Sequence, residues 1–279
     1  MWSDKLKMVA TTTKVYLLGF FFVLVIGFYS HRVVPRDRGD HDLNHQDTYN
    51  YFRRVLVSPG LQDYDYFYLA LQWPPSLCNT PSNKCREDVK NFTYFTIHGL
   101  WPQKQNGRRF NCTSGTALNI TKLRSDKNLL QRLDKYWPSL LVRKTNDEFW
   151  RHEWEKHGRC IGWDQNIYFK TAVNAYVTNN ISTLVEEFAK HGIQKGGSYT
   201  IGNYTEAIQK ILHVRSTIQS ISNRINATLL FEIRLCVDKT GKNLTNCDLI
   251  AFPKWDDEIS NVHFHSLIII PNADLPVHH

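Results

Sequence analysis

The chain has 279 residues, 42% of them hydrophobic, and a formal net charge of +8 at pH 7. This apolar content is enough for one sizeable globular domain with its own core, which excludes a chain too polar to fold. A basic chain favours polyanionic partners, but many basic proteins bind none, so the charge alone selects no function.

The first 30 residues have the pattern of a secretory leader. Three lysines precede an uncharged and mostly apolar run over residues 15–30. The run is shorter than the span of about 20 residues that crosses a bilayer, so we favour a cleaved signal peptide over an uncleaved signal anchor. The residues after the run give no clear cleavage site, and an anchor that tethers the chain to a membrane stays open as the alternative.

Residues 31–63 are polar, mixed in charge and without periodicity, which indicates a flexible stalk or a processed segment. A globular domain is expected over residues 64–279. With either kind of leader this domain enters the secretory pathway. We expect a monomeric extracellular protein, with a vacuole-like or lysosome-like compartment, or a membrane-anchored form with a lumenal domain, as alternatives.

Two stretches early in the domain have the period of two that strands show. Residues 64–73 place Gln72 on the more polar face at the end of the first strand, where it is either an ordinary exposed glutamine or a ligand contact. In residues 94–102, Phe95 and Ile97 face the core, His98 faces the other way, and the strand stops at Gly99. A histidine there is well placed at the edge of a cleft, although such a residue alone is more often structural.

The rest of the domain shows separate helical and strand patterns. A core helix is predicted around residues 129–133, and further helices over residues 165–190 and 203–215. Residues 229–238 and 265–270 are predicted strands, and the first of them directs four side chains inward: Phe231, Ile233, Leu235 and Val237. Together these patterns predict an α+β domain with a mostly antiparallel central sheet and segregated helices.

Titratable side chains crowd into residues 149–160, whose sequence is FWRHEWEKHGRC. On a helix, residues four apart share a face, so Glu153 would lie beneath His157 and His152 beside Lys156. A carboxylate beside an imidazole raises its basicity, and a lysine adds a fixed positive charge, which suits proton transfer around an anion. The alternative for this segment alone is a solvated helix face over a core stripe.

A zinc site is disfavoured in this segment, and no metal or cofactor is expected. His152 and Glu153 begin like the HExxH signature, but the second histidine follows the first by five residues instead of four. On a helix the two imidazoles would then diverge by about 140°.

The two stretches FTIHGLWP (95–102) and FWxHEWxKHGxC (149–160) together resemble the two active-site segments of the ribonuclease T-two family. This family comprises secreted and vacuolar RNA-cleaving enzymes and includes the plant S-ribonucleases. The resemblance extends over about residues 64–271. It implies an endoribonuclease that cleaves single-stranded RNA with low base specificity and without a metal, through a 2′,3′-cyclic phosphate.

The resemblance also implies roles for individual residues. His157 would be the general base for the ribose 2′-hydroxyl and His98 the general acid for the departing 5′-oxygen. Lys156 and a protonated His152 would stabilise the phosphorane, and Glu153 would lie beside the phosphate and orient His157. Five residues are candidate base contacts, through stacking or through their places in the family: Gln72, Trp101, Ser139, Leu141 and Phe149. The alternative for Trp101 and Phe149 is a place in the core.

An even number of cysteines behind a secretory leader predicts disulfides instead of free thiols. Sequence distance and the resemblance favour three pairs: Cys78 with Cys85, Cys112 with Cys160, and Cys236 with Cys247. The second pair would hold His98 and His157 in one cleft. Seven Asn-x-Ser/Thr sequons predict surface glycans: Asn91, Asn111, Asn119, Asn180, Asn203, Asn226 and Asn243.

A second class of function stays open, a secreted glycoprotein with the same fold that acts without catalysis in recognition, storage or defence. Inactive relatives are expected to lack an active-site histidine. This chain retains all five candidate catalytic residues, which favours the enzyme: His98, His152, Glu153, Lys156 and His157.

Overall fold

The structure is a computed structural model, and it describes residues 63–105, 110, 112–223, 227–247 and 262–264. The chain divides into two compact units, residues 1–55 and 56–279, and all described residues belong to the second. The expected leader, nearly all of the expected stalk and the expected strand at residues 265–270 lie outside the described residues. Among the described residues, no helix is both long and apolar enough to cross a membrane.

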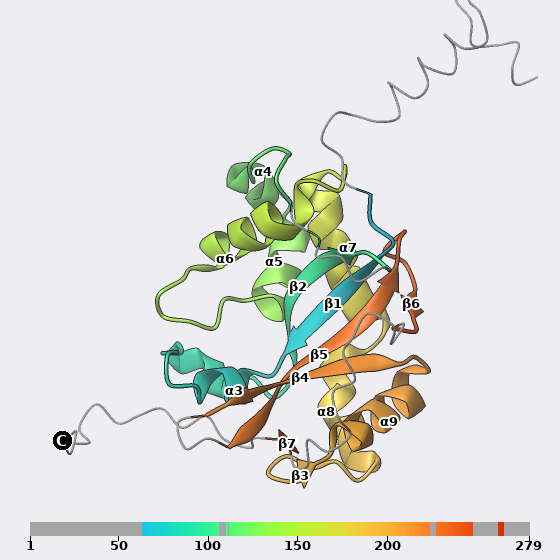
Figure 1. Ribbon diagram of the computed structural model, residues 1–279. Helices are drawn as coiled ribbons and strands as arrows, with labels where there is room; N and C mark the ends of the chain where they lie inside the picture. Colours follow the sequence, from blue (N-terminus) through green and yellow to red (C-terminus); the bar gives the residue numbers. More distant parts are fainter. Residues whose placement is uncertain (1–62, 106–109, 111, 224–226, 248–261, 265–279) are drawn as a thin grey trace, which may run out of the picture. The chain divides into compact units, whose positions relative to one another are not determined.

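A single twisted sheet forms the centre of the described domain (Figure 1). Its main path runs β2-β1-β5-β7-β3, and β4 and β6 also pair with β5. All pairings are antiparallel except the short parallel contact between β5 and β7. The strands are β1 (Tyr66–Gln72), β2 (Thr96–Gln103), β3 (Ser198–Tyr199), β4 (Ser216–Ser222), β5 (Thr228–Asp238), β6 (Leu244–Thr245) and β7 (Val262–His263).

Helices lie beside and behind this sheet in Figure 1, so the α+β expectation is confirmed. They are α3 (Pro74–Cys78), α4 (Ile120–Ser125), α5 (Lys127–Tyr136), α6 (Asn146–Glu153), α7 (Gln165–Thr178), α8 (Leu184–Lys190) and α9 (Ile201–Leu212). The helix predicted over residues 165–190 is in fact two, because Asn180 adopts a left-handed conformation between α7 and α8 (φ 51°). The helix predicted over residues 203–215 ends earlier, at Leu212, where His213 is left-handed (φ 59°).

The core lies between α7 and the rear face of the sheet, which carries the apolar side chains of β1, β2 and β5. Tyr168 and Tyr176 of α7 are fully buried there, and their hydroxyls donate hydrogen bonds to the Leu100 and Phe95 carbonyls of the β2 region (2.8 and 2.7 Å). A buried tyrosine combines a large apolar contact with a satisfied polar end. These two bonds fix β2 against α7.

Strand β2 continues past the expected stop at Gly99 and ends at Gln103. Ala70 of β1 pairs with Gly99 and the next residue, Leu71, pairs with Ile97, so His98 is an extra residue in β2. Such a bulge re-aims a side chain and leaves its backbone outside the ladder. Here the His98 carbonyl accepts a hydrogen bond from the Trp137 indole (2.9 Å). The prediction that the strand stops at Gly99 was wrong, because β2 continues past a bulge whose position is set by the register with β1.

Strand β5 contains a second bulge, where Gln219 of β4 pairs with Glu232 and Ser220 pairs with Leu230. The skipped residue is Phe231, which was expected to face the core. It is half-buried and lines a pocket on the other face. Strand β4 itself was missed in the sequence, because its alternation of serine, threonine and glutamine with isoleucine is a weak strand pattern.

Three disulfides join Cys78 to Cys85, Cys112 to Cys160, and Cys236 to Cys247, the pairs that were expected. The second joins the loop after β2 to the residue that follows the histidine-rich segment. Of the seven sequons, Asn111 and Asn226 lie outside the described residues. The other five asparagines are exposed: Asn91, Asn119, Asn180, Asn203 and Asn243.

Candidate active site

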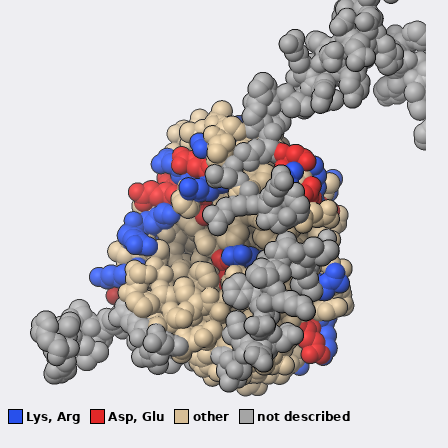
Figure 2. Space-filling model, in the orientation of Figure 1, with Lys and Arg blue, Asp and Glu red and all other residues tan. Residues whose placement is uncertain are grey.

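The face of the sheet opposite α7, here called the front face, carries the polar side chains of the site. Gln72 of β1 pairs with Thr96 of β2 and Glu232 of β5, so residues from three strands meet at this point. Figure 2 shows this face hollowed at its centre, with Lys and Arg side chains on the rim beside α6. His98, which follows the core residue Ile97, lies on the same face and lines a pocket together with Gln72.

His98 is fixed by a buried carboxylate. Its Nδ1 lies 2.5 Å from Glu232 Oε1, and the side chain of Glu232 is 1% exposed. The other carboxylate oxygen, Oε2, accepts a hydrogen bond from Arg234 Nε (2.8 Å). The Arg234 guanidinium lies over the Trp101 ring at 5.1 Å from its centroid, a cation–π contact that fixes the arginine in turn.

Helix α6 carries His152, and the turn after the helix carries His157. Helix α6 begins with a complete capping box between Thr145 and Glu148, which explains where it starts. After Glu153 the chain changes to a π-helical turn, Trp154–Gly158, closed by the bond from Arg159 N to Trp154 O (2.9 Å). The expected α-helical spacing, with Glu153 beneath His157, is therefore wrong. A π-turn joins residues five apart, and such turns are frequent at functional sites.

Trp101 links the two histidines. Its ring centroid is 5.1 Å from that of His98 and 5.3 Å from that of His157. The Trp101 indole Nε1 donates a hydrogen bond to Glu153 Oε2 (2.8 Å), and Glu153 is buried, at 2% exposure. Trp101 therefore contacts the imidazoles from both motifs and also supplies the hydrogen bond to Glu153.

Gly99 makes this arrangement possible. A Cβ at this position would overlap both Trp101 Nε1 and Glu153 Oε2. Only glycine lets the backbone of β2 approach the hydrogen bond between these side chains so closely.

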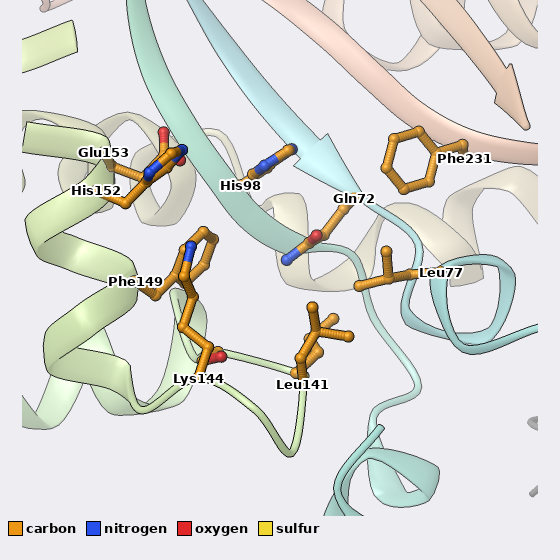
Figure 3. A pocket seen from close by; sticks show the side chains of 11 residues that line it. Gln72, Leu77, His98, Leu141, Lys144, Phe149, His152, Glu153 and Phe231 are labelled. Carbon is orange, nitrogen blue, oxygen red and sulfur yellow. The ribbon is translucent and has the colours of Figure 1, made fainter. Parts of the chain in front are cut away.

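A pocket of about 140 Å³ opens next to His98 (Figure 3). Figure 3 shows His98 and Gln72 on its floor, with His152, Phe149 and Lys144 on the side of α6. Eleven residues line it: Gln72, Leu77, His98, Ser139, Leu140, Leu141, Lys144, Phe149, His152, Glu153 and Phe231. An apolar wall with a few convergent polar groups is typical of a small-ligand site.

The pKa values of His98 and His157 are shifted in opposite directions. Burial disfavours the charged form of His98, but the nearby charge and hydrogen bond of Glu232, with a further contribution from Glu153, outweigh it and raise the pKa of His98. Burial lowers the pKa of His157 to about 3, and the positive charges of His98, His152 and Lys156 act in the same direction. Neighbouring groups with pKa values moved apart have the character of an acid and a base.

The pKa values of Glu153 and His152 are also moved. Burial raises the pKa of Glu153, although His98 and the Trp101 bond act against it. Burial, with Lys144, Lys156 and His98, lowers the pKa of His152. Both groups therefore favour their neutral forms more than in water.

The structure brings the candidate base contacts to different places. Gln72 is 3% exposed and lines the pocket, so the interpretation as an ordinary exposed glutamine is wrong. Ser139, Leu141 and Phe149 line the same pocket, whereas Trp101 lies beside His98 and His157 and is not in the pocket wall. Trp154, by contrast, is 3% exposed and belongs to the core.

Sequence reasoning missed Glu232, Arg234 and Lys144. Glu232 and Arg234 were visible as charged residues in the middle of the predicted strand 229–238, but His98, the partner of Glu232, lies 134 positions away in the sequence. Lys144 precedes the helix cap, and its Nζ lies 5.6 Å from the Phe149 ring centroid at the pocket. Charged residues within a buried strand are a signal worth following.

Comparison with known proteins shows the family of this chain. The profile of the Ribonuclease T2 family matches residues 64–247. The chain belongs to the ribonuclease T2 family. It is 32% identical over 209 residues to Ribonuclease 1 of Arabidopsis thaliana, covering 73% of this chain and 88% of that protein. It is 29% identical over 211 residues to Extracellular ribonuclease LE of Solanum lycopersicum, covering 74% and 90%.

A solved structure has the same fold. RNase NT in complex with 5′-AMP superposes with a TM-score of 0.63 at 30% identity, covering 73% of this chain and 99% of RNase NT. Membership of the ribonuclease T2 family supports ribonuclease activity, with RNA as the substrate. The name of ribonuclease LE describes that relative as extracellular.

Proposed function

We propose that this ribonuclease T2 member cleaves single-stranded RNA by metal-independent transphosphorylation with low base specificity. The ribose 2′-oxygen attacks the adjacent phosphorus, the bond to the 5′-oxygen breaks, and the product carries a 2′,3′-cyclic phosphate. Slower addition of water to that phosphate gives a 3′-phosphate. The nucleophile belongs to RNA, so the protein needs only a base, an acid and positive charge.

The observation that supports this proposal most is that the pKa values of His98 and His157 are shifted in opposite directions while both rings contact the Trp101 indole. His157, whose pKa is lowered to about 3, is neutral over the physiological range and takes the proton of the 2′-hydroxyl. His98, whose raised pKa keeps it protonated to higher pH, gives a proton to the departing 5′-oxygen. These are the roles that the resemblance to the family implied.

Positive charge for the phosphorane comes from Lys156, an exposed residue of the π-turn, and from His152 when it is protonated. Because the pKa of His152 is lowered, its charge contributes in acid and is lost toward neutral pH. Glu153, with its raised pKa, lies beside these groups and shares the proton during transfer. Its position follows from the Trp101 hydrogen bond.

The pocket beside His98 would hold one base of the substrate. Phe149 and Phe231 offer aromatic surfaces, Leu141 and Ser139 close the wall, and Gln72 presents an amide that both donates and accepts hydrogen bonds. Trp101 would support the ribose or base on the other side of the scissile phosphate. Stacking accepts every base, which agrees with low specificity.

The test uses the full chain, produced under oxidising conditions, with a labelled oligoribonucleotide and added EDTA. Cleavage that leaves a cyclic phosphate is expected, and His157→Ala or His98→Ala should reduce it by about a hundredfold or more. His191→Ala, an exposed residue after α8, is the matched control and should retain full activity. Full activity in either active-site variant would contradict the mechanism. No cleavage by the folded wild type would instead favour a non-catalytic secreted glycoprotein.

We also propose that the domain is secreted and glycosylated. Five exposed sequon asparagines support this, and two of them, Asn119 and Asn203, use Oδ1 to cap a helix, which leaves Nδ2 for a glycan. The three disulfides require an oxidising compartment. A mass shift on treatment with an N-glycosidase is the expected result for protein from a secretory host.

A further inference from the structure

Glu232 is a buried carboxylate outside both sequence motifs, and it contacts a proposed catalytic group. Strand β1 lies between β2 and β5, so His98 and Glu232 come from strands that are not neighbours. Adjacent strands are about 4.8 Å apart, so the pair must bridge about twice that distance. Two features allow it: the bulge lifts His98 out of the ladder, and β1 presents only the small Ala70 on this face next to Gln72.

Both oxygens of this carboxylate have partners. Oε1 faces His98 Nδ1 at 2.5 Å and Oε2 accepts from Arg234 Nε at 2.8 Å. An ionised carboxylate only accepts hydrogen bonds, so Nδ1 of His98 carries a hydrogen and Nε2 is the nitrogen left to deliver a proton. Arg234 is itself fixed over the Trp101 and Tyr68 rings, at 5.1 and 6.0 Å from their centroids. The carboxylate is thus fixed on a rigid strand with one orientation.

We propose that Glu232 is a positioning residue for the RNA cleavage proposed above: its carboxylate orients the His98 ring through Nδ1 and holds the imidazole in the protonated form that donates from Nε2. This inference rests on the proposed function. In other enzymes, a carboxylate that accepts a hydrogen bond from a catalytic imidazole selects the tautomer of the ring and stabilises the imidazolium. Glu232 would act on His98 in the same way.

The other charged groups around His98 do not supply the same effect. Facing His98 are Glu232 and Arg234 from β5, His152 and Glu153 from α6, and His157 from the π-turn. Arg234 disfavours its positive charge, and His152 and His157 do so only when they are themselves protonated. Burial raises the pKa of Glu153, so this carboxyl is a weaker source of negative charge. The pKa of Glu232 is lowered despite burial, because His98 and Arg234 stabilise its ionised form.

Two substitutions separate this role from a merely structural ion pair. Glu232→Gln keeps the shape and a hydrogen-bond acceptor but removes the charge, so the alkaline limb of kcat/KM should move down by about one pH unit or more. At pH values above the new limb, kcat/KM should then fall by about tenfold, and activity on the acid side should be retained. Arg234→Gln keeps the carboxylate and removes an opposing cation, so the limb should move up. A purely structural pair predicts equal losses at every pH in both variants.

The experiment measures kcat/KM on a dinucleotide substrate from acid to alkaline pH for the full-length wild type and both variants. Glu206→Gln on α9, which removes an exposed carboxylate paired with Lys210, is the matched control and should leave the profile unchanged. Circular dichroism establishes that each variant is folded. If Glu232→Gln does not fold, Arg234→Gln decides: an upward move of the limb supports the inference, and an unmoved or lowered limb overturns it.

A second readout does not need catalysis. The titration of His98 by ¹H–¹⁵N NMR, assigned by its absence in His98→Ala, should give a lower pKa in Glu232→Gln and a higher one in Arg234→Gln. An unchanged His98 pKa in Glu232→Gln overturns the inference even if the wild type cleaves RNA. A wild type that does not cleave overturns the proposed function, and this titration then decides separately whether Glu232 holds the proton on His98.

Discussion

Replacement of Trp101 by phenylalanine tests the hydrogen bond that connects the two motifs. Trp101 Nε1 is the donor to Glu153 Oε2, and Glu153 is 2% exposed, so its carboxylate would lose this partner where water is scarce. A buried group that loses its partner costs about 1 to 3 kcal/mol, more when it is charged. We therefore expect Trp101→Phe to lower the free energy of unfolding by about 2 kcal/mol when Glu153 is ionised.

The pH dependence of this loss has a definite sign. The pKa of Glu153 is raised above its ordinary value of 4.5, so Glu153 is ionised above that raised pKa and neutral well below 4.5. The bond is charge-assisted only when Glu153 is ionised, so the loss should be largest above the raised pKa and shrink as pH falls through it. Urea unfolding followed by far-ultraviolet circular dichroism, at one pH well below 4.5 and at one pH above the raised pKa, measures the free energy of unfolding under both conditions.

A double-mutant cycle with Glu153→Gln isolates the pair. In the Glu153→Gln background the indole meets a neutral amide, and Trp101→Phe should cost only about 1 kcal/mol. An equal loss in both backgrounds and at both pH values would refute the reasoning, because it would mean that Trp101 stabilises the domain through ring packing alone.

Three further predictions concern the same site. The proposed mechanism requires a neutral His157 and a protonated His98. We therefore expect kcat/KM to persist in acid down to about pH 3, where His157 gains its proton, and to fall as pH rises through the raised pKa of His98. A measured pH–rate profile that declines well above pH 3 on the acid side would contradict this assignment. Gly99→Ala should destabilise by about 1 to 3 kcal/mol and reduce activity, because its methyl group displaces Trp101 and Glu153. Calorimetry against Gly202→Ala in α9, where the added methyl meets only Thr200 Oγ1 at 3.5 Å, is the comparison. Paired replacement of Cys112 and Cys160 by serine removes a crosslink across 48 positions and should lower the free energy of unfolding by about 4 kcal/mol in denaturant titrations, a loss that would be near zero if the crosslink left the unfolded chain unconstrained.

Much of the structure of this domain could be predicted from short-range patterns in the sequence. The alternation in β1 and β5 and the two motifs around His98 and His157 are short-range features, and the cysteine pairs followed from the family resemblance. These features could be read from the sequence because each depends on neighbouring residues or on a motif with a fixed order.

Long-range contacts were not predictable. The bulge at His98 arises from the register with β1, and the carboxylate that contacts His98 comes from Glu232, 134 residues further along the chain. The π-turn after Glu153 has no local signature that separates it from a continued α-helix. The break at Asn180 was different, since two consecutive asparagines at 179 and 180 are a turn signal that the helical pattern obscured.

The extra residue in β2 allows the fold and the chemistry to be separated. Ile97 pairs with Leu71 and Gly99 with Ala70, so deleting His98 alone would restore an ordinary register and leave Ile97 and Leu100 on the α7 side. The apolar packing therefore does not require the imidazole, but the carbonyl of the extra residue is the acceptor for the buried Trp137 indole. The extra position thus contributes its carbonyl to the core and its side chain to the proposed proton transfer, and only replacement of the side chain separates the two.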